Sequence, residues 1–283
     1  MINRMAKATL VATICTLSAH SYADQAGGTV GNFQFALQQT EYDYWGSSYT
    51  PWKGFSLGGS ISNPVGDSNA VQVDFKGFNL ADKDDDGYYP VHALSGAAHY
   101  IWKRGSYDVG AFGGVLMTNG YYGSGTDMNL FLGGEGRTDL TDAISLHGQL
   151  GFLENQKSYY EYTGSVYFGQ AVVSGFAGNN LLLEASLGFI YGGVGDSSGE
   201  DAKTHTWGVR AEYGFLKSLS GFVAVSGHQD NDHWKDSDFD TMSIAVGVNY
   251  GFGADSLKAR HQAAPAMKPM NFDAISWLRI DGY

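Results

Sequence analysis

The sequence predicts an all-β protein: an antiparallel, up-and-down transmembrane β-barrel of about twelve strands, followed by a short C-terminal tail. Three features predict this fold. The chain begins with a predicted export signal, it contains after that signal no apolar run long enough for a membrane-spanning helix, and its apolar residues recur with a period of two. Closure is expected because lipid offers no hydrogen-bond partners to an open sheet edge.

The first 23 residues have the composition of a secretory signal peptide. Arg4 and Lys7 form a short basic region, residues 8–19 are mostly apolar, and Ser21-Tyr22-Ala23 offers small residues to a signal peptidase. The apolar run is well below the roughly 20 residues that a spanning helix needs, so a membrane anchor is the weaker alternative. We therefore predict a signal peptide over 1–23, an outer-membrane barrel over 24–253, and a periplasmic tail over 254–283.

Composition excludes two classes of protein. Cys15 is the only cysteine and lies in the predicted signal, so a secreted domain held by disulfides is excluded. The chain has 17 Lys and Arg against 29 Asp and Glu, and removing the two basic residues of the signal changes the formal charge from −12 to −14. Such acidity argues against nucleic acid as a partner.

The alternation of apolar and polar residues predicts where the strands run. Between residues 143 and 152, Ile144 and Leu146 fall on one face of a strand, and Ser145, His147 and Gln149 fall on the other. Twelve segments of this kind are predicted. They begin near Phe33, Phe55, Val71, Val91, Tyr107, Met128, Ala143, Tyr160, Leu181, Thr206, Gly221 and Thr241. An even number of strands returns the end of the chain to the side where it began.

The connections between these segments alternate in length. Those after even segments are short and rich in turn formers, whereas several after odd segments are longer and more polar, including 82–89, 196–205 and 229–238. This pattern is typical of a barrel with periplasmic turns and external loops. It predicts a location in the outer membrane with both termini periplasmic. A soluble β-sandwich is the weaker alternative, because it would expose the second apolar face to water.

The last predicted strand carries the only motif that points to a protein family. Gly247 is followed three and five residues later by Tyr250 and Phe252. This spacing resembles the final strand of the outer-membrane porin-like β-barrel superfamily of Gram-negative bacteria. The resemblance implies that the barrel assembly machinery is a partner and reads these residues. The sequence departs from the pattern at Ala245, where the family usually has a polar residue, and in the 31 residues that follow Phe252.

The alternation also predicts which polar residues face the lumen. They are Asp74, Lys76, His99, Asp108, Asn129, Glu135, Arg137, His147, Gln149, Glu184, Arg210 and Glu212. Two arrangements are open for them. In a water-filled pore such charges set ion preference. In a narrow barrel Arg137 or Arg210 pairs with Glu135, Glu184 or Glu212 and closes the lumen.

Two functions follow from these arrangements. The leading hypothesis is a narrow passive channel for small hydrophilic solutes or ions, with a mild cation preference from the acidic external loops. The alternative is a closed structural or surface-interaction barrel whose loops bind divalent cations, lipopolysaccharide or a protein partner. In both, outer-membrane lipid and lipopolysaccharide surround the barrel, and no cofactor is expected.

An enzyme is not predicted. A lipid hydrolase would need a serine beside a histidine base that a third group orients. The nearest pairs in the sequence are Ser145 with His147 and Ser226 with His228. Ser145 and His147 fall on the predicted lumen face, where lipid does not reach.

One acidic segment partly matches a calcium-binding loop. Asp82, Asp84 and Asp86 alternate and precede Gly87, as in the first half of such a loop. The bidentate glutamate expected at the twelfth position is Ala93, so at most weakly bound calcium is predicted.

The tail contains two different kinds of sequence. Prolines and alanines over 263–269 break regular structure, and the segment from Asn271 to Ile280 around Trp277 is apolar. The tail is expected to be a periplasmic extension, and the alternative is that the Trp277 segment plugs the barrel mouth.

Overall fold

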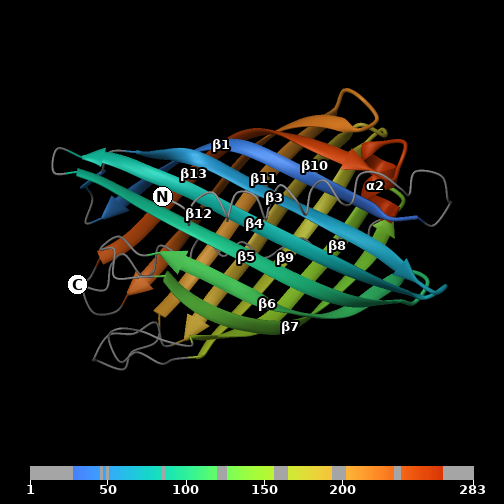
Figure 1. Ribbon diagram of the computed structural model, residues 1–283, viewed down its shortest axis with the longest axis horizontal. Coiled ribbons are helices and arrows are strands. Elements are labelled where there is room, and N and C mark those ends of the chain that lie inside the picture. The colour runs from blue at the N-terminus through green and yellow to red at the C-terminus, as the bar shows by residue number, and fades with distance from the viewer. Residues whose placement is uncertain are drawn as a thin grey trace, which may run out of the picture.

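The structure is a computed structural model that describes residues 28–44, 47–48, 51–84, 87–119, 126–155, 165–192, 202–232 and 237–263. Its elements are β1 Val30–Tyr44, β2 Ser47–Ser48, β3 Trp52–Val65, β4 Asn69–Asp84, β5 Gly87–Lys103, β6 Tyr107–Asn119, β7 Thr126–Thr141, β8 Ile144–Asn155, β9 Ser165–Ala177, β10 Leu181–Gly192, β11 Ala202–Gly214, β12 Leu219–Asp232, β13 Ser237–Phe252 and α2 Leu257–Ala263. Figure 1 shows the strands as one tilted, curved sheet.

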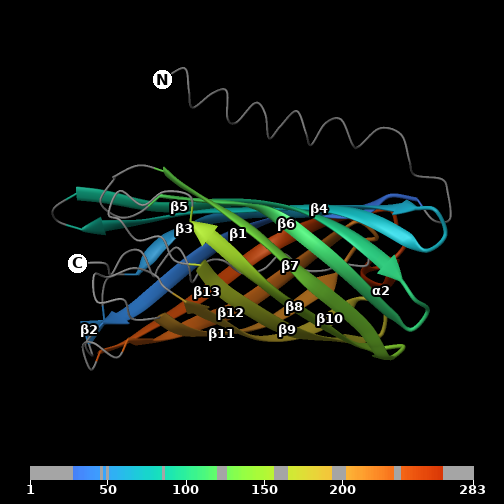
Figure 2. The same cartoon turned by 90° about the horizontal axis from the view of Figure 1, so that it is seen from below.

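The sheet closes into a barrel. Each strand pairs antiparallel with its neighbour in the chain, and β1 pairs with β13 from Gly31 opposite Phe252 to Tyr44 opposite Phe239. Leaving aside the two-residue β2, which pairs with the end of β1, the described ranges contain twelve strands of 12 to 17 residues. The predicted fold class is therefore confirmed. The view in Figure 2 shows the same barrel from below.

The predicted strand positions agree with the structure in most places. Each predicted start lies within four residues of a strand start, except Tyr160, which lies outside the described residues. The predicted connections at 82–89, 196–205 and 229–238 are wrong in part. The strands extend into them: β4 continues to Asp84 and β5 begins at Gly87, β11 begins at Ala202, and β12 continues to Asp232. Strand pairing satisfies the backbone in water as well as in lipid, so a hairpin can extend past the end of the apolar alternation.

The outer wall of the barrel is apolar. Leu37 is 64% exposed and Leu187 is 70% exposed, and large apolar side chains project outward from β1 and from every strand from β3 to β13. Tyr100, Tyr107 and Tyr213 are exposed near the end with the short turns, as expected for an interfacial aromatic girdle. A surface of this kind is suited to a bilayer and not to water.

The interior is packed on one side. Its apolar cluster consists of Trp52, Phe78, Leu80, Val91, Ala93, Phe112, Leu116, Phe131, Leu153, Val166, Phe168 and Ile190. These residues come from the inward positions of β3 to β10, and most lie in the half of the barrel nearer the longer loops.

Glycines allow the rings of this cluster to pack against the wall. A Cβ at Gly133 would lie 2.5 Å from the Phe112 ring, and one at Gly151 would lie 2.5 Å from the Phe168 ring. Aromatic rings thus cover inward glycines of neighbouring strands, which accounts for part of the glycine content.

The described ranges contain one helix, α2, which is seven residues long. No helix in these ranges is long and apolar enough to cross a membrane.

Candidate functional site in the barrel interior

The predicted lumen residues lie on the inner face of the barrel. Asp74, Asn129, His99, Glu135, Arg137, His147, Gln149, Glu184 and Glu212 are buried inside it. Lys76 and Arg210 line an internal cavity, and half-buried Asp108 is the strand partner of Arg137. These positions alternate with the exposed apolar residues of the same strands, as the period of two requires.

One group of these residues forms a buried ion-pair cluster. The Nε2 of His99 lies 3.0 Å from Oδ2 of Asp74, and its Nδ1 lies 2.8 Å from Oε1 of Glu135. The three side chains are at most 1% exposed. Gln72 donates to Asp74, and Gln149 donates to the second oxygen of Glu135. The histidine therefore bridges two carboxyl groups on the filled side of the lumen.

A second group surrounds Arg210. Its Nη2 lies 2.6 Å from Oε2 of Glu212, and its Nη1 donates to Gln34 at 3.2 Å. Its guanidinium also stacks on the Phe222 ring, with 3.7 Å from Cζ to the ring centroid. Glu184, which accepts a hydrogen bond from Ser174, lies 3.9 Å from the Nε of Arg210. Arg210 thus pairs with two of the acids predicted for it.

The described hydrogen bonds of Arg137 are to other groups than the acids named for it in the sequence. Its Nη2 donates to Asp139 at 3.0 Å and its Nη1 donates to the carbonyl of His261 at 2.9 Å. The β7–β8 register shifts between Asp139 and Thr141, and this irregularity lies at the end of the barrel where the chain turns. Arg137 therefore contacts α2, whereas Glu135 bonds to His99.

The other side of the lumen is hollow. A cavity of about 290 Å³ runs from α2 toward the middle of the strands, between β1, β3, β4 and β9 to β13. Many of the inward side chains here are small, which leaves the space open. They are Ser56, Ser60, Ser186, Ala224, Ser226, Ser243 and Ala245, together with Gly208.

Helix α2 lies across the end of the barrel that has the short turns (Figure 1). Gly253 turns the chain there with a φ of +82°, a conformation that favours glycine, and a Cβ on it would meet the backbone of Thr29 and Val30. Ser256 then caps the helix by accepting a hydrogen bond from the Ala259 amide at 3.1 Å.

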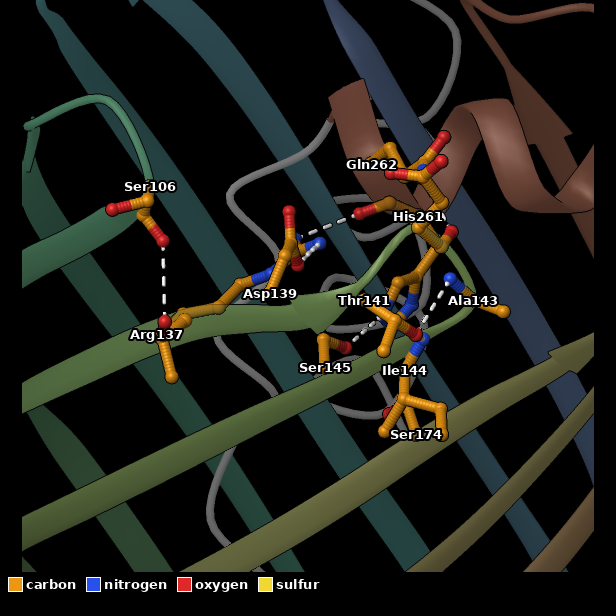
Figure 3. Close-up of polar contacts among 12 residues, drawn as sticks. Ser106, Arg137, Asp139, Thr141, Ala143, Ile144, Ser145, Ser174, His261 and Gln262 are labelled. Carbon is orange, nitrogen blue, oxygen red and sulfur yellow. Dashed lines mark hydrogen bonds and ion pairs between the residues drawn. The ribbon is translucent and has the colours of Figure 1, made fainter.

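Helix α2 forms hydrogen bonds with strands and turns on several sides of the barrel. His261 contacts Arg137 through its carbonyl and Ser145 through its ring, 3.3 Å from the serine hydroxyl, as Figure 3 shows. The Lys258 amide donates to the Asn179 carbonyl in the β9–β10 turn, and Gln262 donates to the Asp142 carbonyl in the β7–β8 turn. The helix therefore narrows this mouth of the lumen.

Arg260 connects α2 to the seam where the barrel closes. Its guanidinium packs against Gly251 of β13, where a Cβ would overlap it, and it is 5% exposed. Burial lowers the pKa of the Arg260 guanidinium, and the nearby Glu212 carboxylate opposes that shift.

Helix α2 and its two inward residues, Arg260 and His261, were not predicted from the sequence. Ser256 and the helix-favouring segment after it could have indicated this helix, because serine is a common N-cap residue. The Trp277 segment, which was the proposed plug, lies outside the described residues.

The structure describes only part of the predicted calcium-binding segment. Asp82 and Asp84 have strand backbones paired with Tyr89 and Gly87, while Asp86 and the side chains of all three lie outside the described part of the structure. Within that part, no group of three His, Cys, Asp or Glu side chains is placed to hold a metal ion.

The serine and histidine pairs considered for catalysis all face inward. Ser145 contacts His261 and not His147, and the ring of His228 contacts Thr241 at 2.6 Å. Neither serine therefore has the expected histidine as a hydrogen-bond partner in the described contacts.

The residues of the C-terminal motif lie on the closing strand. Tyr250 faces outward and is exposed, and the Phe252 ring stacks on Phe33 across the seam at 5.9 Å. Gly247 faces inward, where a Cβ would lie 2.7 Å from the Phe222 ring.

Comparisons with known proteins identify the fold. No protein-family model matches the sequence, and no curated protein matches it. Among solved structures, an outer-membrane channel from Pseudomonas putida F1 matches with a TM-score of 0.57 and 13% identity, over 83% of this chain and 98% of that one. This chain has the fold of the outer-membrane β-barrel proteins of Gram-negative bacteria.

Two further solved structures of this fold are similar at lower scores. The translocator domain of the autotransporter NalP from Neisseria meningitidis has a TM-score of 0.48 and 12% identity, over 88% of this chain and 95% of that one. The KdgM porin has a TM-score of 0.44 and 14% identity, over 77% of this chain and 99% of that one.

Proposed function

We propose that the protein is a narrow passive channel of the outer membrane that conducts small hydrophilic solutes or ions. The observation that carries this proposal is the cavity between β1, β3, β4 and β9 to β13, lined by hydroxyl, amide and charged groups. A polar, hollow interior inside an apolar outer wall is the arrangement that conduction needs. The end with the short turns and α2 would face the periplasm, and the long loops would face outward.

Helix α2 makes the channel narrow. It lies at one end of the cavity, and its residues Leu257, Arg260 and His261 line the space. A solute that enters from the loop end must pass beside this helix, or the helix must move. Small conductance is therefore expected, and the acidic external loops would add a mild cation preference at the entrance.

The alternative function is a closed barrel that acts through its surface. The apolar cluster on β3 to β10 and the Asp74–His99–Glu135 cluster fill much of the lumen, and this observation favours closure. In that case the acidic loops would bind divalent cations, lipopolysaccharide or a protein partner.

Planar-bilayer recording with the purified full-length protein separates the two functions. A channel gives discrete current steps in potassium chloride, and liposomes that contain it release small polar solutes faster than empty liposomes. If folded protein inserts, as judged by a heat-dependent gel shift, and gives no current at any voltage, the closed-barrel function stands instead.

A further inference from the structure

The cavity contains a buried cation whose hydrogen-bonding capacity is not filled by the described residues. Arg260 lines the cavity and is 5% exposed, and its Nη1 has no hydrogen-bond acceptor among the described residues. A buried donor without an acceptor is costly, by about 1–3 kcal/mol and by more for a charged group. Arg260 is therefore the natural place for an acceptor that enters the cavity.

The acid that offsets the charge of Arg260 is already engaged. Glu212 accepts hydrogen bonds from Ser220 and Asn249 on Oε1 and from Arg210 on Oε2. It acts on Arg260 through its charge alone, without a hydrogen bond. The pairing of Arg210 with Glu212 thus leaves the Nη1 of Arg260 unsatisfied.

The other groups around the cavity fit a small polar anion. Three basic side chains line it, those of Lys76, Arg210 and Arg260, against two acidic ones, those of Glu184 and Glu212. Neutral hydrogen-bonding groups surround them, from Asn32, Gln34, Gln38, Gln170 and several serines. Phe222, Leu182 and Val172 supply apolar contact area for a carbon skeleton.

We propose that this cavity binds a small organic anion whose carboxylate or phosphate oxygens accept a hydrogen bond from Arg260. The cavity volume of about 290 Å³ is at the lower end of the range for ligand pockets, so the ligand has roughly the size of one sugar or sugar acid. The inference deepens the proposed channel function by naming a solute class, and its binding step does not require conduction.

Isothermal titration calorimetry on the full-length protein in detergent tests this proposal. The probes are gluconate for a carboxylate, glycerol 3-phosphate for a phosphate, and glucose as a neutral molecule of similar size. We expect at least one anion to bind saturably and glucose to bind at least about tenfold more weakly, because a hydrogen bond to a charged group is lost. Equal binding of glucose and both anions, or binding of none of the three, overturns the proposal.

Two variants locate the site. Arg260→Gln removes the charge and is expected to weaken anion binding by about 10- to 100-fold. Gly251→Ala keeps the charge but puts a Cβ where the guanidinium lies, so it is expected to weaken binding as well. Lys258→Gln is the matched control: it removes one positive charge from the same helix, does not line the cavity, and is expected to leave affinity unchanged.

The outcomes separate the site from the channel. Each variant is first shown to be folded by its heat-dependent gel shift. If Arg260→Gln binds the anion as tightly as the original protein, or if Lys258→Gln loses the same affinity, the site is not at Arg260. Anion binding without any bilayer current supports the site and contradicts the channel, whereas current without anion binding does the opposite.

Discussion

His99 is expected to be a major determinant of barrel stability. Replacing it by leucine removes both the contact with Asp74 at 3.0 Å and the contact with Glu135 at 2.8 Å, and all three side chains are at most 1% exposed. The contact with Glu135 is a hydrogen bond to a charged group, which contributes about 1.5–3 kcal/mol, and the ion pair with Asp74 is taken as similar in strength, so losing both should cost about 3–6 kcal/mol. That range agrees with the cost of about 3–5 kcal/mol for breaking a buried ion pair.

The assay is equilibrium unfolding in urea of protein folded into lipid vesicles, followed by tryptophan fluorescence. The free energy of unfolding of His99→Leu should fall by about 3–6 kcal/mol relative to the original protein. The control is the triple variant Asp74→Asn, His99→Leu and Glu135→Gln, which removes the two carboxylates as well. It should recover much of the loss, because replacing a whole buried ionic group is often nearly neutral.

Two results would refute this reasoning. A change below about 0.5 kcal/mol in His99→Leu would mean that the cluster contributes no more than an ordinary surface residue. A triple variant as unstable as the single one would mean that packing of the ring against Phe112, 5.6 Å away between centroids, outweighs the ion pairs.

Three further predictions follow from the wall and the mouth of the barrel. Leu187→Lys, on the outer wall, should lower the free energy of unfolding in vesicles by about 2–4 kcal/mol, and the neighbouring inward change Ser186→Lys should lower it much less. Equal losses in the same unfolding assay would contradict the assignment of the outward and inward faces of β10. Gly247→Val should lower the yield of the heat-modifiable folded form in the outer membrane, because its side chain meets Phe222 and the backbone of β1, while Val248→Ala at the next outward position should not. Truncation after Gly253 removes α2 and should raise single-channel conductance, and an unchanged conductance would show that α2 does not narrow the pore.

The faces of the strands could be predicted because one physical rule governs every position of a spanning strand. In β8, Ser145, His147 and Gln149 are buried inside while Ile144 and Leu150 are exposed outside, as the alternation requires. The alternation of apolar and polar residues is required only where a strand lies in the membrane. Asp82 and Asp84 still belong to β4, but the apolar alternation no longer marks them, so they were assigned to a loop.

The pairing of the lumen charges could not be predicted from the same rule. Alternation shows that Arg137 faces inward, but its partner depends on the register irregularity at Asp139 and on a carbonyl 124 residues away in α2. Arg260 was missed for a related reason. It follows the last strand, and it reaches the lumen only because Gly253 turns the chain back over the mouth.

A pair of adjacent cysteine substitutions on β13 tests the central claim most directly. Ser243 lines the cavity and Ile244 is exposed on the outer wall, and the only native cysteine, Cys15, precedes residue 24. In intact outer membranes, Ser243→Cys should react with a small water-soluble thiol reagent, and Ile244→Cys should react only with a reagent that partitions into lipid. If both positions react equally with the water-soluble reagent, the outer wall is not in a bilayer; if only Ile244→Cys does, the two faces are reversed.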